Sequence, residues 1–488
     1  MITQQELEKY LWGAATALRG TIDAGDYKQY IFPLLFFKRI SDVYDEEYQN
    51  SLKESDGDAE YATFAENHHF QVPKGAHWDD VRETTVNIGA ALQNAMRSIE
   101  QANPDTLHGI FGDASWTNKD RLSDAMLTNL IEHYSQHNLN LSNVPDDKLG
   151  DAYEYLIKEF ADDSGHTAAE FYTNRTVVKL MTMIMDPQPG ESVYDPTCGS
   201  GGLLLNCALH LKGEGKEYRT LKLYGQEINL LTSAIARMNM FMHGIEEFDI
   251  VRGDTLANPG LLENDKLKKF NVILANPPYS IKAWDRKSFE SDPWGRNLWG
   301  MPPQGCADYA FQQHIQKSLD ENNGRSISLW PHGILFRDSE AQMRKQMIEE
   351  DLVECVIGLG PNLFYNSPME ACLLITKTNK EKNKKNKILF INAVDQVKQE
   401  KTIGFLLEEH IAKIFKAYKD FNSVPSFAAL VNKEDVLAKN GNMAINRYVR
   451  TKEHDESKTA NFSDSYKEWN SSSEQLKASM NELFEVLK

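Results

Sequence analysis

The sequence predicts an α/β protein with a mostly parallel sheet, a helical domain before it and a helical tail after it. From about residue 163, short apolar runs alternate with amphipathic stretches, which predicts a parallel sheet with helices on both faces. Residues 1–162 carry helical spacing instead, and residues 453–488 are polar before they end in one amphipathic stretch. We therefore expect three parts, residues 1–162, 163–452 and 453–488.

The amino-terminal part is predicted to be helical. The segments LEKYLWGAATALRG and YKQYIFPLLFFKRISDVYDEEY carry apolar residues three and four positions apart. DKLGDAYEYLIKEFADD is a further amphipathic helix, and DDSGHT is a connector after it. The domain boundary is therefore placed near residue 162.

The central part, residues 163–452, is predicted to alternate between strands and helices. Predicted strands are ESVYD, TLKLYGQEI, FNVILA, SISLWP, ECVIGL and ACLLITK, and the first two are followed by the helices LLLNCALHLKG and LLTSAIARMNMFMHG. Ligands of such sheets bind at the carboxyl ends of the strands. A glycine-rich turn after the first strand and an Asn-Pro-Pro-Tyr sequence after the third both fall at that edge.

Net charge and cysteine content indicate which partners and which cellular compartment to expect. The net charge is −18, whereas a protein that holds DNA by itself usually has a basic surface. Most phosphate contacts are expected from another chain, with a hidden basic cleft as the alternative. The start, MITQQELEKY, has neither the basic end nor the apolar stretch expected of a signal peptide, and no apolar stretch approaches the length expected of a membrane span. Five cysteines without CxxC spacing indicate a reducing cytoplasm, and without HExxH no metal is expected.

Two segments have two interpretations each. The lysine-rich segment KTNKEKNKKNK, residues 377–387, is either an exposed hairpin loop or a phosphate contact. The final helix carries an apolar stripe that either folds back on its own core or packs on a partner. The stripe consists of Trp469, Leu476, Met480, Leu483 and Leu487.

The turn VYDPTCGSGG indicates a nucleoside cofactor. A glycine turn between a strand and a helix brings backbone N–H groups close to a ligand. The dinucleotide fingerprint fails because Leu204 stands where its third glycine belongs, and no Walker A loop is present. S-adenosylmethionine fits, since its charged amino acid and sulfonium suit Asp195 better than a phosphate does. The turn residues expected to bind the cofactor are Asp195, Pro196, Gly199, Ser200, Gly201 and Gly202.

Two further acids follow on successive strands. Glu227 ends the strand KLYGQE, where its carboxylate can accept hydrogen bonds from both ribose hydroxyls. Asp254, in VRGDTL, follows the next short strand and could meet the adenine amino group. An isolated acid at a strand end is often structural, but three in order form a stronger pattern.

The sequence NPPY ends a buried strand with a rigid turn. The amide oxygen of Asn276 and an adjacent backbone carbonyl, fixed by Pro277 and Pro278, form two acceptors for an NH2 group. They would orient the amine toward a methyl sulfonium, so that positioning matters more than a strong base. Tyr279 would stack on the ring that bears the amine, and a base in duplex DNA would have to be extruded. The alternative is a plain turn.

These blocks together resemble a known family. AAEFYTNRTVVKLM, DPTCGSGG and NPPY follow a helical domain with ALRG…DYKQYIFPLLFFKRISD, and GCADYAFQQHI, LWPHGILFR and IGLGPNLFYNSPMEACLLI come later. Over nearly the whole chain this order resembles the modification (methyltransferase) subunit of type I restriction–modification systems. The resemblance implies a Rossmann-like class I S-adenosylmethionine-dependent methyltransferase fold. It also implies a site-specific DNA adenine-N6 methyltransferase that acts on a flipped-out adenine.

The resemblance assigns further residues. It implies that one segment closes over the methionine part of the cofactor, and that Asn276 to Tyr279 carry the adenine-N6 chemistry. That segment consists of Glu170, Phe171, Tyr172, Thr173, Asn174 and Arg175. Relatives commonly have proline in place of Asn174, and many have phenylalanine in place of Tyr279. Independently of the family, this segment also reads as a helix start with Thr173 or Asn174 as N-cap.

The resemblance also implies partners and leaves two other functions to exclude. By this resemblance, two modification subunits flank one specificity subunit on double-stranded DNA, and a restriction subunit joins the full complex. Because the specificity subunit would supply much of the grip on DNA, the acidic net charge of this chain is explained. A methyltransferase for a protein glutamine or an RNA base would share NPPY but not the helical block. A catalytically silent scaffold would be indicated by absent cofactor binding.

Overall fold

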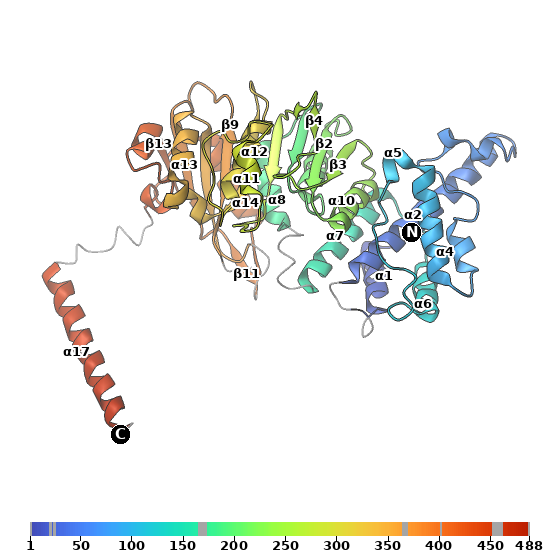
Figure 1. Cartoon of the computed structure of the whole chain (residues 1–488), viewed down its shortest axis with the longest axis horizontal. Helices are drawn as coiled ribbons and strands as arrows, with labels where there is room; N and C mark the ends of the chain where they lie inside the picture. The colour runs from blue at the N-terminus through green and yellow to red at the C-terminus, as the bar shows by residue number, and fades with distance from the viewer. Residues whose placement is uncertain are drawn as a thin grey trace.

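The computed structural model describes residues 2–18, 22, 26–163, 173–363, 369–400, 403–450 and 462–486. Glu170, Phe171 and Tyr172 therefore lie outside the described residues. Figure 1 shows a helical region at the amino-terminal end, a sheet with helices in the middle, and one helix standing apart at the carboxyl-terminal end.

The amino-terminal region is built from helices, as predicted. Its first helix begins with a reciprocal cap, because the side chain of Thr3 accepts from the backbone N–H of Glu6 while the Glu6 carboxylate accepts from that of Thr3. The longest helix runs through Pro33, and every residue from Tyr30 to Tyr44 in it is buried, so this part of the helix is enclosed on all sides. The helices are α1 (Gln4–Thr16), α2 (Lys28–Glu54), α3 (Trp78–Arg82), α4 (Ile88–Ala102), α5 (Pro104–Leu107), α6 (Asp124–Tyr134) and α7 (Asp146–Asp163), with two 3-10 turns at Tyr61–Thr63 and Ala65–Asn67.

The central sheet has nine strands in the order β13-β10-β8-β9-β7-β6-β1-β2-β3. Their bounds are β1 (Ser192–Asp195), β2 (Lys222–Glu227), β3 (Phe248–Arg252), β6 (Val272–Ala275), β7 (Arg325–Pro331), β8 (Val353–Leu359), β9 (Ala371–Lys377), β10 (Lys387–Ala393) and β13 (Ala428–Asn432). Strands β3, β2, β1, β6 and β7 are parallel, and β9 runs antiparallel between β7 and β8. All six strands predicted from the sequence are confirmed.

Helices cover both faces of this sheet, which confirms the α/β prediction. One face packs on α8 (Arg175–Met185), α9 (Gly202–Gly213) and α14 (Glu408–Asp420), and the other on α12 (Asp308–Ser318) and α13 (Ala341–Glu349). Shorter elements are α11 (Arg286–Glu290), α15 (Lys433–Leu437), the 3-10 turns His332–Leu335, Asp338–Glu340 and Ile445–Arg447, and the ribbons β4 (Leu262–Glu263) with β5 (Lys266–Leu267) and β11 (Lys398–Glu400) with β12 (Ile403–Phe405). The chain leaves β1 for β2 and β3, then returns to β6 on the other side of β1. This reversal opens a crevice at the carboxyl ends of β1 and β6.

Helix α10 (Leu230–Met242) belongs to two cores at once. Its residues Ile235 and Met238 lie in the core of the amino-terminal helices, whereas Ala236 and Met240 lie in the core under the sheet. The hydroxyl of Tyr153, in α7, donates to the backbone carbonyl of Ile235 at 3.3 Å. The chain passes out of the helical region after α7, but its hydrophobic core continues into α10.

The lysine-rich segment 377–387 is a largely exposed loop, as one interpretation predicted, with Lys382 and Lys385 exposed, but it is not a hairpin. The hairpin interpretation is wrong because β8 lies between β9 and β10 in the sheet. Two of its lysines turn inward: the Nζ of Lys380 lies 2.7 Å from a carboxylate oxygen of Asp351, and that of Lys384 lies 3.6 Å from one of Glu354. These lysines neutralise acids of the sheet domain, so they are not phosphate ligands.

The carboxyl-terminal helix α17 (Phe462–Val486) stands clear of the remaining protein (Figure 1). Three side chains of its predicted apolar stripe are exposed, with Trp469 at 63%, Leu476 at 64% and Met480 at 48%. These three do not fold back on the core. Leu487 lies outside the described residues, and the side chain of Leu483 is not described.

No helix among the described residues is both long enough and apolar enough to cross a lipid bilayer.

The contact of α7 with α10 predicts a cost for one added methyl group. A Cβ at Gly150 would lie 2.4 Å from the ring of His243, which is buried in the fold. We expect Gly150→Ala to lower the free energy of unfolding by about 1–3 kcal/mol, because neither helix can move without opening the shared core. Denaturant unfolding measures this. The control is Gly213→Ala, since nothing lies within 4 Å of a Cβ there; an equal loss in both variants would contradict the steric explanation.

Candidate active site

The crevice between β1 and β6 is lined by the glycine-rich turn. Strand β1 ends at Asp195, and α9 begins at Gly202. Gly201 has φ 79°, and a Cβ there would lie 2.9 Å from the methyl group of Met240 in α10. Only glycine satisfies both the left-handed backbone and this close approach. The turn therefore rests directly on α10.

Asp195 is the buried acid of this turn. It is 1% exposed, and one carboxylate oxygen accepts from the backbone N–H of Thr197 at 2.9 Å. Burial, with a smaller contribution from the nearby carboxylate of Glu227, raises the pKa of Asp195 to about 8. A cation that binds beside this carboxyl would relieve both effects, so the site favours a positively charged group.

Glu227 ties the second strand to the turn. Its carboxylate accepts from the backbone N–H of Gly199 at 3.1 Å and from that of Asn229 at 2.9 Å. Asp254 follows β3 as predicted, but it is exposed and accepts from the backbone N–H groups of Leu256 and Ala257. Glu227 is thus hydrogen-bonded to the turn, whereas the hydrogen bonds of Asp254 stay within its own loop.

The segment before α8 forms the opposite wall. Asn174 is the N-cap of α8, since its side chain accepts from the backbone N–H of Thr176, which confirms one of the two predicted caps. Its amide nitrogen also donates to the backbone carbonyl of Gly404 at 2.8 Å. The guanidinium of Arg175 lies over Gly202, where a Cβ would be 1.8 Å from its Nη1.

The walls enclose a cavity of about 20 Å³. This is room for about one water molecule, so a larger ligand requires the surrounding residues to move apart. A cation, Arg175, and a carboxyl, Asp195, both face it. Its lining residues are Thr173, Arg175, Asp195, Thr197, Cys198, Gly199, Ser200, Gly202, Leu203 and Asn276.

Asn276 follows β6 and faces this cavity. Its amide nitrogen donates to the hydroxyl of Thr173 at 3.0 Å, and its amide oxygen accepts from the hydroxyl of Tyr279. Tyr279 packs against the cores on both faces of the sheet. Both ends of the amide therefore have a partner within the protein, and the oxygen retains a second lone pair that can accept from an amine.

A buried ion pair supports the chain after NPPY. Asp308 is fully buried and accepts from the backbone N–H of Ser280 at 2.7 Å, where Ser280 has φ 52°. The other carboxylate oxygen accepts from Arg337 at 2.6 Å. Arg337 also contacts Cys306 and Glu340. Burial raises the pKa of the Glu340 carboxyl to about 7. Cys306, Asp308 and Glu340 lie close enough together to hold a metal ion, and the guanidinium of Arg337 contacts all three.

The structure brings most of the sequence-predicted residues together, and it adds some. One crevice is surrounded by Thr173, Asn174, Arg175, the turn from Asp195 to Gly202, Glu227 and Asn276 to Tyr279, whereas Asp254 is not among the residues that line its cavity. Sequence reasoning gave no role to Asp308 or Arg337. The block GCADYAF marks Asp308, but nothing in the sequence indicates that it accepts from Ser280.

The strand order β3-β2-β1-β6-β7-β9-β8, with β9 antiparallel, and the turn from Asp195 to Gly202 define a class I S-adenosylmethionine-dependent methyltransferase fold. A family model described as N-6 DNA Methylase matches residues 144–457, and one described as HsdM N-terminal domain matches residues 7–134. The chain belongs to the N-6 DNA methylases and, among them, to the methylase subunits of type I restriction enzymes.

Similar proteins extend over most of the chain. A type I restriction enzyme methylase subunit of Methanocaldococcus jannaschii is 31% identical over 462 residues, covering 88% of this chain and 76% of the relative. One of Mycoplasma pneumoniae is 28% identical, covering 91% of this chain and 89% of the relative. The solved type I restriction-modification methyltransferase subunit of Streptococcus thermophilus is 30% identical, with a TM-score of 0.80 over 92% of this chain and all (100%) of that one.

Loss of the Asp308–Arg337 ion pair is predicted to slow methyl transfer, although neither residue is assigned a contact with the substrate. Asp308→Asn keeps the shape but loses the charge that pairs with Arg337, so we expect the turn after NPPY to loosen. DNA methylation in a single turnover should slow on the order of 10- to 100-fold, since small misplacements of reacting groups are costly. Asp338→Asn is the control, because Asp338 is exposed beside the same arginine. Equal rates in both variants would contradict the support role.

Proposed function

We propose that this chain is the modification subunit of a type I restriction–modification complex and transfers a methyl group from S-adenosylmethionine to adenine N6 in DNA. The observation that carries the proposal is the place of Asn276, at the end of β6 and on the same cavity as Asp195 and Arg175. An amide that can receive an amine thus adjoins a turn suited to a zwitterionic cofactor.

The side chains around the turn fit this cofactor. Asp195 would pair with the ammonium group and Arg175 with the carboxylate of its amino-acid part, which matches the two charges on the cavity. Glu227 would accept the ribose hydroxyls, Asp254 would meet the adenine amino group, and N–H groups of the turn would contact the ligand. The resemblance adds Glu170, Phe171 and Tyr172 to this set. When bound, the cofactor supplies an activated methyl group on its sulfonium.

The NPPY turn would hold the target amine. The side-chain oxygen of Asn276 and the backbone carbonyl of Pro277 would accept its two N–H groups, which leaves the nitrogen lone pair directed at the methyl donor. The ring of Tyr279 would stack on the flat base that bears this amine. A duplex adenine reaches such a site only if it is extruded from the helix.

We propose that sequence recognition lies in a separate specificity subunit flanked by two modification subunits, with a restriction subunit in the full complex. The net charge of −18 supports this, because a chain this acidic gains little from phosphate contacts alone. The exposed stripe of α17 supports a contact through residues 453–488. Residues 1–162 would form the helical domain and residues 163–452 the catalytic domain. The complex would act in the cytoplasm, where its DNA substrate lies.

A modified-base map of the source genome tests the proposal and requires no assumption about the target sequence. With Asn276 intact, we expect N6-methyladenine at one recurring motif; with Asn276→Ala, the mark should disappear, because an acceptor for the amine is lost. Calorimetry should find cofactor affinity unchanged in Asn276→Ala but weakened about tenfold or more in Glu227→Ala, which loses charge-assisted bonds. A map that Asn276→Ala leaves intact would direct attention to methylated protein or RNA instead.

The exposed stripe of α17 predicts a dependence of assembly on this helix. Leu476→Asp places a charge on the same face as Trp469 and Met480, so we expect co-purification with the specificity subunit to fall while cofactor binding remains. Deletion of residues 465–488 should do the same. Ser471→Asp adds the same charge on the opposite face and is the control. If the deletion variant still co-purifies with the specificity subunit at full yield, the helix is not needed for assembly and the prediction is wrong.

A further inference from the structure

A carboxylate of the helical region reaches the glycine-rich turn. Glu154 lies in α7, and its side chain is 17% exposed. One of its carboxylate oxygens accepts from the amide nitrogen of Asn239 at 2.7 Å, and the other pairs with Nη2 of Arg175. A residue from the first part of the chain thus contacts a residue that lines the cavity of the candidate active site.

Asn239 extends the same contact to the backbone of the turn. It lies in α10 and is fully buried (0% exposed), and its amide nitrogen also donates to the backbone carbonyl of Ser200 at 3.0 Å. One NH2 group therefore joins Glu154 to the turn. Because Asn239 holds the carboxylate independently of Arg175, Glu154 has a defined position from which to orient the guanidinium.

The two ends of the guanidinium face different partners. Nη2 of Arg175 pairs with Glu154, while Nη1 is the atom closest to the space above Gly202, at the amino terminus of α9. A helix amino terminus carries partial positive charge, so a second cation there is unfavourable without an anion. Glu154 supplies that anion on the outer side and leaves the Nη1 side directed at the turn. The planar fork of an arginine allows both contacts at once.

We propose that Glu154 is a positioning residue for the cofactor: it fixes Arg175 above the glycine turn, so that the helical domain determines how well the carboxylate of the cofactor's amino-acid part is held. This inference rests on the proposed function, since it assumes S-adenosylmethionine as ligand. It assigns to Glu154 no contact with the ribose, the adenine or the reacting methyl group. Its effect is confined to ligands that carry the carboxylate.

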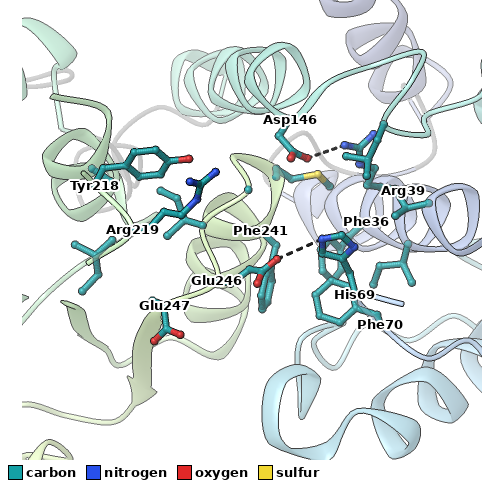
Figure 2. A pocket seen from close by; sticks show the side chains of 18 of the residues that line it. Phe36, Arg39, His69, Phe70, Asp146, Tyr218, Arg219, Phe241, Glu246 and Glu247 are labelled. Atoms are coloured by element: carbon teal, nitrogen blue, oxygen red, sulfur yellow. Dashed lines mark hydrogen bonds and ion pairs between the residues drawn. The ribbon is translucent and has the colours of Figure 1, made fainter. Parts of the chain in front are cut away.

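Away from Glu154, the amino-terminal helices and the sheet domain are separated in part by a cavity. The cavity between them has a volume of about 540 Å³. It is lined by Phe36 and Phe70 on one side and by Phe241 and Tyr218 on the other (Figure 2). An ion pair between His69 and Glu246, at 3.5 Å, crosses it. Close packing therefore does not fix the helical region everywhere, and the polar contacts of Glu154 connect its position to the cofactor turn.

Two nucleoside ligands separate this role from a general effect on the fold. S-adenosylhomocysteine carries the amino-acid carboxylate, and 5′-methylthioadenosine lacks the whole amino-acid part. We expect Glu154→Gln, in the full chain purified with its specificity subunit, to bind S-adenosylhomocysteine about tenfold more weakly and 5′-methylthioadenosine unchanged. Arg175→Gln should have a similar effect, and the double variant should bind no worse than Arg175→Gln alone.

Asp147→Asn is the matched control. Asp147 also lies in α7 and forms an ion pair with Lys212 of α9, so it crosses the same contact between regions without approaching the turn. It should leave both affinities unchanged. Equal weakening of both ligands in Glu154→Gln would overturn the proposal in favour of general distortion, and so would unchanged or tighter binding of S-adenosylhomocysteine. A wild-type complex that binds neither ligand would instead refute the proposed function itself.

Discussion

The packing of α10 between two cores is the constraint on which the arrangement of this protein depends. One side of α10 completes the core of the amino-terminal helices, and the other side supports the glycine turn through Met240. A displacement of α7 is therefore transmitted to the turn by packed atoms rather than through the chain. Close packing around α10 transmits such a displacement, although a cavity separates the two regions elsewhere. The helical region is thus part of the framework of the catalytic crevice.

The crevice combines opposite charges with a neutral amide. Burial holds the pKa of Asp195 near 8, so this carboxyl is largely protonated at neutral pH until a cation approaches. Arg175 provides the matching positive charge on the facing wall, and Asn276 lines the same cavity. Such a site discriminates by charge pattern first and by shape second. Under the proposed function it would need no strong base, because the amide would only have to orient an amine.

Much of this could be predicted from local sequence. Apolar runs such as Val272–Ala275 mark buried strands because a strand covered on both faces has no polar positions. The acids at Asp195 and Glu227 were recognisable because they end such strands, and Asn174 because short polar side chains cap helices.

Contacts between residues distant in the sequence could not be predicted in this way. Glu154 reads as one charge on an amphipathic helix, and only the fold brings it to Arg175. Lys380 and Lys384 read as a solvated run, because the acids that they neutralise lie on other strands and loops. The fold also decided that β8 lies between β9 and β10, which no local pattern specifies.

The double role of α10 has a consequence for the order in which the chain is made. The helices up to Asp163 leave the ribosome first, but Ile235 and Met238, which complete their core, are synthesised later. At roughly 5–20 residues per second, the nascent helical region spends several seconds with that face uncovered. Synthesis thus exposes apolar surface during a defined interval, in which a chaperone or the ribosome surface can shield it. Truncated products that end before α10 should be the aggregation-prone species of this protein.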